Sequence, residues 1–313
     1  MQVGRPDDIS TSHEPSDMCS EPPELEPVSR TYVSQGLQLR YMDWGNPSAP
    51  LLLLVHGICE HSRSWDRTAR ALCRDWHVVA PDLRGHGDSA WSPDRSYLSS
   101  CYLLDMANLM ASLPHERTSV VAHSLGGNIM ARFTAVFPEQ VTKLVLIEGL
   151  GPTPQALANW DRQGPVQRTR AWIDRQRAPP DKSARVFESI AEAQTRLIKA
   201  NPRLSCELAL HLARHGVRPC AHGYAWKHDP LVSTFPPEDF ALQGPLFWQE
   251  IAKPTLLFQG AESWTANPEM DGRAMHFRDR RTVVVEGAGH WVHHDQFENF
   301  HRATAGISLI LPL

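Results

Sequence analysis

The chain has 313 residues, of which 42% are hydrophobic and 21% charged, the composition of a globular protein with length for one large core. Its net charge of −4 gives no basic face for nucleic acid, and no apolar run is long enough to span a bilayer. We therefore expect neither a nucleic-acid partner nor a membrane association.

The first 28 residues are polar, rich in Pro, Glu, Asp and Ser, and lack the apolar centre of a signal peptide. They are expected to form a disordered N-terminal tail, 1–28, because such a segment buries little surface. The six cysteines, at 19, 59, 73, 101, 206 and 220, show no paired or C-x-x-C spacing. This pattern favours reduced thiols and a cytoplasmic location.

Strand and helix patterns alternate along the first half of the chain. Residues 37–45 alternate apolar and polar, as a half-buried strand does, and 49–57 form a continuous apolar run closed by glycine. Next come a helix at 63–76, a strand opening 77–89, a helix at 102–113, a strand at 118–123, a helix at 125–138 and a strand within 142–152. This alternation predicts an α/β fold, a mostly parallel central sheet with helices on both faces.

The alternation stops at about residue 151 and resumes after 250. Residues 151–250 are polar with helical patterns and no convincing buried strand, so we expect a helical lid that excludes water from a pocket. The lid interrupts a core formed by residues 29–150 and 251–313. The returning core is predicted to contain a strand at 253–260, a short helix at 267–277, a strand within 281–290, a helix from about 295, and a packed closing segment at 307–313.

The stretch "SVVAHSLGGNIM" places Ser124 between a predicted strand and a predicted helix. A bend this sharp needs small neighbours, and Ala122 and Gly126 stand two residues before and after the serine. This is the G-x-S-x-G nucleophile elbow with alanine for the first glycine. It would hold the hydroxyl at the carboxyl edge of the sheet and at a helix N-terminus, although packing alone could also require small residues here.

Two more stretches fall at the same predicted edge. In "LLLLVHGICEHSRSW", Gly57 ends a buried strand, so the backbone N–H of Ile58 could join that of Leu125 in an oxyanion hole. In "VVVEGAGHWVHHDQ", His290 follows a strand on a Gly-rich loop and could serve as the base for Ser124. The loop "PDLRGHGDS" is given a structural role, with His86 packed rather than catalytic.

With these motifs in this order and spacing, the chain from about residue 30 onward resembles the α/β-hydrolase family. The segments "ANPRLSCELALHLARHGV" and "YAWKHDP" resemble its serine-hydrolase-like (kraken-type) branch and the bacterial relatives of that branch. The resemblance implies a Ser-acid-His triad, no metal or organic cofactor, and ester-type hydrolysis. Relatives that cleave epoxides or carbon–halogen bonds normally use an aspartate nucleophile, so a serine argues against both.

The acid of the triad is the open point of this resemblance. The family most often supplies it three or four residues past the glycine that ends the penultimate strand, where this chain has Ser263 and Trp264. The family's other location is the end of the strand after the nucleophile helix, where Glu148 stands in "LVLIEGLGP". We favour Glu148 for the triad and keep Glu262 as the rival.

His290, His293, His294 and Asp295 lie close together in the sequence but match no common zinc spacing, so no metal is expected. His293 and His294 are instead expected to begin a helix and to line the surface.

The sequence thus predicts a serine hydrolase that cleaves a small, apolar acyl ester through an acyl-enzyme, with Ser124, His290 and Glu148 as its triad. A same-fold perhydrolase, acyltransferase or carbon–carbon hydrolase, and a non-catalytic small-ligand-binding protein, remain alternatives. The oligomeric state does not follow from the sequence.

Overall fold

The computed structural model describes residues 25–178, 186–234, 236 and 243–305. Most of the expected tail 1–28 and the expected closing segment 307–313 lie outside these residues.

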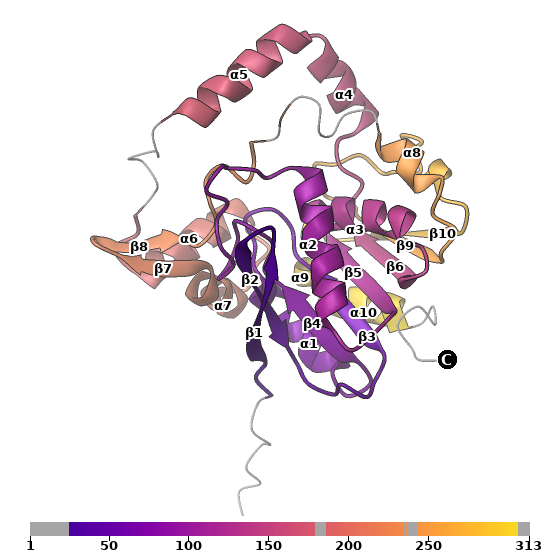
Figure 1. Ribbon diagram of the computed structural model, residues 1–313, viewed down its shortest axis with the longest axis horizontal. Helices are drawn as coiled ribbons and strands as arrows, with labels where there is room; N and C mark the ends of the chain where they lie inside the picture. The colour runs from indigo at the N-terminus through magenta and orange to yellow at the C-terminus, as the bar shows by residue number, and fades with distance from the viewer. Residues whose placement is uncertain (1–24, 179–185, 235, 237–242, 306–313) are drawn as a thin grey trace, which may run out of the picture.

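The molecule is built on one eight-stranded sheet, ordered β1-β2-β4-β3-β5-β6-β9-β10 (Figure 1). All neighbouring pairs are parallel except β1 with β2 and β2 with β4, so the expected mostly parallel sheet is confirmed. The strands are β1 Val28–Ser34, β2 Leu37–Asp43, β3 Leu51–Val55, β4 His77–Pro81, β5 Thr118–His123, β6 Val141–Ile147, β9 Thr255–Gly260 and β10 Arg280–Val285.

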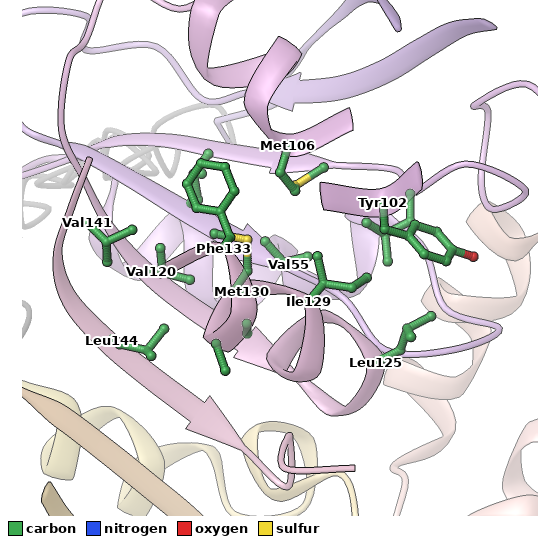
Figure 2. Packing of buried hydrophobic residues seen from close by; sticks show 14 of the residues in the cluster. Val55, Tyr102, Met106, Val120, Leu125, Ile129, Met130, Phe133, Val141 and Leu144 are labelled. Carbon is green, nitrogen blue, oxygen red and sulfur yellow. The ribbon is translucent and has the colours of Figure 1, made fainter. Parts of the chain in front are cut away.

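Helices cover both faces of this sheet, and β3 shows how its two sides are used. Leu51, Leu53 and Val55 belong to one hydrophobic cluster, and Leu52 and Leu54 to another. The first cluster contains residues of α2 and α3, some of them drawn in Figure 2, and the second contains residues of α1 and α10. The core helices are η1 Ser62–Trp65, α1 Asp66–Leu72, α2 Ser99–Ser112, α3 Ser124–Val136, η2 Ala274–His276, α9 Val292–Asp295 and α10 Phe297–Ala305.

The segment between β6 and β9 leaves the sheet and carries its own elements. They are α4 Pro154–Asp161, α5 Pro165–Arg177, α6 Ile190–Ala200, α7 Cys206–Gly216, β7 Val217–Cys220, β8 Gly223–Trp226 and α8 Gly244–Trp248. In Figure 1, α4 and α5 arch away from the sheet, while α6, α7 and the hairpin formed by β7 and β8 lie to one side of it. The antiparallel pair β7–β8 is an addition to the helices expected here; only Val217 of its residues is buried, which explains why no buried-strand pattern was visible.

The structure differs from the predicted elements in three places. Residues 28–34, of which only Val28 was assigned to the tail and for which no strand was expected, form β1, whose mostly exposed residues hide the strand pattern. The helix expected at 267–277 is a series of turns ending in the short 3-10 helix η2. In place of one helix from about 295 there are two, α9 from Val292, with His293 and His294 in its first turn as expected, and α10 from Phe297. Within the described residues, no helix is both long and apolar enough to cross a membrane.

Candidate active site

Ser124 stands at the sharp turn between β5 and α3. Its φ of 48° lies in the left-handed region, which a non-glycine residue rarely adopts. A Cβ on Gly126 would come within 2.6 Å of the backbone carbonyl oxygens of Val55 and His56. The turn therefore requires a residue without a side chain at position 126, as the elbow motif predicts.

His290 reaches Ser124 from the loop between β10 and α9. Its Nε2 lies 3.0 Å from Ser124 Oγ, which is hydrogen-bond distance. Burial lowers the pKa of His290, the hydrogen bond to Glu148 raises it, and the net direction is downward from its ordinary value. A neutral imidazole at this position can accept a proton from the serine.

Glu148, which follows the end of β6, contacts His290 on the side away from Ser124. Its Oε2 lies 3.1 Å from His290 Nδ1, so the contact expected of this residue is present. The side chain is fully buried, and its Oε1 accepts a hydrogen bond of 2.8 Å from the Gly260 N–H. The residue has a φ of 51°, so the chain is in the left-handed region at the acid as well as at the serine.

The loop after β9 supports the Glu148 carboxylate. Ser263 Oγ donates a 2.8 Å hydrogen bond to Glu148 Oε2, and the Thr265 hydroxyl donates to the same oxygen. Ser263 occupies a position where the family usually has its acid, and here its hydroxyl binds the acid instead. This support was not predicted from the sequence, although a hydroxyl at the position where the family usually has its acid was a usable signal.

The rival acid, Glu262, points elsewhere. Its carboxylate is 54% exposed and forms an ion pair with Arg203 of the inserted segment. Two residues after Glu262, Trp264 is 80% exposed, and its ring centroid lies 5.0 Å from that of His290. Trp264 therefore flanks the open side of the histidine.

The loop after β3 carries Ile58, whose N–H was predicted to be an oxyanion donor. The N–H of Gly57 donates to Glu60 Oε2 over 3.0 Å, which leaves the next amide, that of Ile58, as the candidate donor. Leu125 is the second residue of α3, and the first N–H groups of a helix have no partner within it. The Ile58 loop follows β3 and Leu125 follows β5, and these two strands are parallel neighbours, so both amides lie at the same carboxyl edge of the sheet.

A second buried pair, Glu60 and His123, joins the loops of the site and was missed from the sequence. His123 Nδ1 lies 2.8 Å from Glu60 Oε1, and His123 Nε2 lies 3.0 Å from the backbone oxygen of His290. Burial lowers the pKa of His123, but the Glu60 carboxylate raises it above its ordinary value overall. Gly57 is required beside this pair, because a Cβ there would lie 2.6 Å from His123 Nδ1.

Of the remaining histidines, some are buried or exposed as expected and one is not. His86 is fully buried, with Nδ1 2.9 Å from the Arg84 backbone oxygen, in keeping with its packed assignment. His293 was expected on the surface and is buried instead, stacked on Trp65 with ring centroids 4.4 Å apart. The two adjacent histidines face different surroundings, since His294 is only partly buried.

Comparison with known proteins identifies the family. The α/β hydrolase fold family matches residues 50–297, which is most of the chain. The chain belongs to the α/β hydrolase fold family. It is 30% identical over 88% of its length to the esterase Rv0045c of Mycobacterium tuberculosis, covering 85% of that protein.

Other relatives match over shorter regions. The chain is 30% identical to the serine hydrolase-like protein of Danio rerio and 31% identical to the human serine hydrolase-like protein 2. Each match covers 61% of this chain, and it spans 59% of the zebrafish protein and 60% of the human one. Among solved structures, a thioesterase domain from the curacin biosynthetic pathway superposes with a TM-score of 0.78 at 28% identity, over 91% of this chain and 98% of that one.

Proposed function

We propose that this protein is a serine hydrolase in which Ser124 is the nucleophile, His290 the general base and Glu148 the residue that orients the base. The observation that carries the proposal is the unbroken row from Ser124 Oγ through His290 to Glu148 Oε2, with contacts of 3.0 and 3.1 Å. Nucleophile, base and acid within hydrogen-bond distance are the requirements of this chemistry.

In the first half-reaction, Ser124 Oγ attacks the substrate carbonyl carbon while its proton passes to His290 Nε2. The carbonyl oxygen becomes an oxyanion, which the N–H groups of Ile58 and Leu125 stabilise. The intermediate collapses, the bond to the leaving group breaks, and His290 returns its proton to that group. Water then attacks the acyl-enzyme by the same route and releases the acid.

Glu148 sets the tautomer and the orientation of His290 throughout these steps. Its carboxylate accepts the Nδ1–H, which leaves the Nε2 lone pair facing the serine, and it stabilises the imidazolium after proton transfer. The donors from Gly260, Ser263 and Thr265 hold the carboxylate in place.

We propose a carboxylic ester or thioester as substrate class. The name of the mycobacterial esterase and that of the curacin thioesterase domain support acyl transfer to water. The chain also matches the mouse epoxide hydrolase 4 over 44% of its length, but the serine at the elbow argues against epoxide opening through an aspartyl ester. The inserted segment 151–250 would act as the lid, and its apolar side chains favour an apolar acyl group. The described cysteines are all free thiols, which supports a cytoplasmic location.

The test is covalent labelling with a fluorophosphonate probe, followed by turnover of matched ester and thioester substrates. The wild-type chain should label and turn over, and Ser124→Ala should do neither while keeping its circular dichroism spectrum. Ser112→Ala, which removes a hydroxyl bonded only to the Leu109 carbonyl on α2, is the control and should behave as wild type. Full labelling of Ser124→Ala would disprove the elbow assignment, and a folded wild type that neither labels nor turns over would favour the binding-protein alternative.

A further inference from the structure

A group of potential metal ligands lies away from Ser124, where the inserted segment meets the core. His211 and His215 stand one turn apart on α7, with ring centroids 4.7 Å from each other. They face Asp66, the first residue of α1, and His211 Nε2 lies 3.2 Å from Asp66 Oδ2. One ligand atom from each residue can be chosen so that all three lie within 4.8 Å of one another.

Two imidazoles four residues apart on a helix, with a carboxylate opposite, form a donor set for zinc and related ions. Bonds of about 2.0 to 2.1 Å in a tetrahedral site put ligand atoms about 3.4 Å apart. The present separations therefore close by small side-chain rotations. Asp66 is buried and both histidines are half-buried, so the ligands are held on rigid elements but remain within reach of solvent.

The surroundings leave room for an ion, and the two arginines beside Asp66 form ion pairs with a carboxylate. The three residues line a surface groove of about 850 Å³, which has space for the waters that complete the coordination. Arg63 and Arg70 lie beside Asp66, and Glu26 forms ion pairs with both of them, at 2.7 and 2.9 Å. Arg63 Nε is 2.9 Å from Asp66 Oδ1 and 2.7 Å from Oδ2, so an ion bound at Oδ2 would displace the guanidinium from that oxygen and leave it on Oδ1.

The two histidines can present lone pairs. Burial, with a further contribution from Arg63, lowers the pKa of His215 to about 4, so that imidazole is neutral near pH 7. The hydrogen bond that His211 donates to the Asp66 carboxylate raises the pKa of His211. His211 Nε2 also lies 3.0 Å from the Arg63 backbone oxygen, so an ion at this nitrogen would replace the proton that Nε2 holds between the two oxygens. A second grouping, Glu60, His123 and His293, is less accessible to an ion from solution, because both of its histidines are buried, whereas His211 and His215 are half-buried.

We propose that Asp66, His211 and His215 form a binding site for a divalent transition-metal ion such as Zn²⁺, Co²⁺ or Ni²⁺. The ion would clamp α7 of the inserted segment to α1 of the core. It would act next to an existing contact, since His61 Nε2 lies 3.1 Å from the Leu212 backbone oxygen. The site takes no part in the proposed hydrolysis and does not depend on it.

The experiment is titration of the metal-free full-length chain with Co²⁺, followed by its visible absorption, and with Zn²⁺, followed by calorimetry. We expect one ion per chain and a melting temperature about 4 °C higher at a free ion concentration 100 times Kd. Mg²⁺ and Ca²⁺ should give no shift, because they require oxygen ligands.

His211→Gln and His215→Gln should each weaken Co²⁺ binding by at least about tenfold, since even residues that only support a ligand cost that much. His222→Gln, an exposed histidine in the β7–β8 turn, is the matched control and should bind as wild type. If His211→Gln fails to fold, the half-buried His215→Gln decides. The proposal is overturned if the wild type binds no ion below about 100 µM, if both variants bind as wild type, or if binding is lost only in His290→Gln.

Discussion

The sheet core and the inserted segment 151–250 are packed in different ways. Every residue of β3, β4, β5 and β9 is buried, whereas α4 and α5 have no buried residue. Within the insertion, the described hydrophobic clusters around α6 and α7 are small. The three residues of the proposed triad all come from the core, so the proposed chemistry lies in the region with dense packing, and the loosely packed region is the proposed lid.

This division has a physical reason in the backbone. Ser124 and Glu148 both adopt left-handed φ angles at the ends of strands, a conformation that costs about 1 to 3 kcal/mol for a non-glycine residue. Such strain persists only where the surroundings determine the conformation. The buried strands β5 and β6 supply that constraint, and the exposed helices α4 and α5 could not.

The largest expected effect is loss of the triad carboxylate. Glu148→Gln keeps the shape but removes the charge that fixes His290, so turnover should fall on the order of 10⁴-fold, as in other triads. Glu262→Gln, the matched change on the exposed ion pair with Arg203, should stay within about tenfold of wild type. Steady-state ester hydrolysis measures both. Equal activities would mean that the wrong strand has been chosen for the acid.

The difference in packing predicts a matched pair of stability effects. Ile129 on α3 is 1% exposed and packs in the cluster of Figure 2, so Ile129→Ala should lower the free energy of unfolding by about 2 to 5 kcal/mol. Ile173 on α5 is 41% exposed, and Ile173→Ala should change it by less than about 1 kcal/mol. Urea denaturation gives both values. A large loss from Ile173→Ala would show that α5 packs on the body in solution.

The same contrast explains what could be predicted from the sequence. The succession of strands and helices along the core and the elbow at Ser124 depend on local patterns, buried apolar runs and small residues, and these were predictable. The hairpin β7–β8 and the 3-10 turn η2 lack such patterns because few of their residues are buried. The Glu60–His123 pair could not be predicted, because it joins residues 63 positions apart that meet only in the folded chain.

The Glu60–His123 pair leads to a prediction about the pH dependence of activity. Burial lowers the pKa of His290, and the positive charge of His123, held by Glu60, lowers it further. Catalysis requires neutral His290, so activity is lost as the pH falls through this pKa. His123→Gln removes the charge, and the acidic limb of the kcat/KM profile should move to higher pH. In the insertion, His222→Gln should leave the limb in place. An unmoved limb in His123→Gln would contradict the coupling.

The smallest expected effect concerns the N-terminus. Deletion of residues 1–24 should leave the melting temperature within about 1 °C of wild type, because a polar, Pro-rich segment has little apolar surface to bury. Deletion of residues 1–34 is the contrasting variant. It removes β1, which pairs with β2 along its whole length, and the ion pair of Arg30 with Asp43 at 2.6 Å, so it should lower the melting temperature by several degrees. Differential scanning calorimetry compares the two. If the shorter deletion destabilises as much as the longer one, residues before Leu25 contribute to the packed body, and the boundary of the core lies earlier than β1.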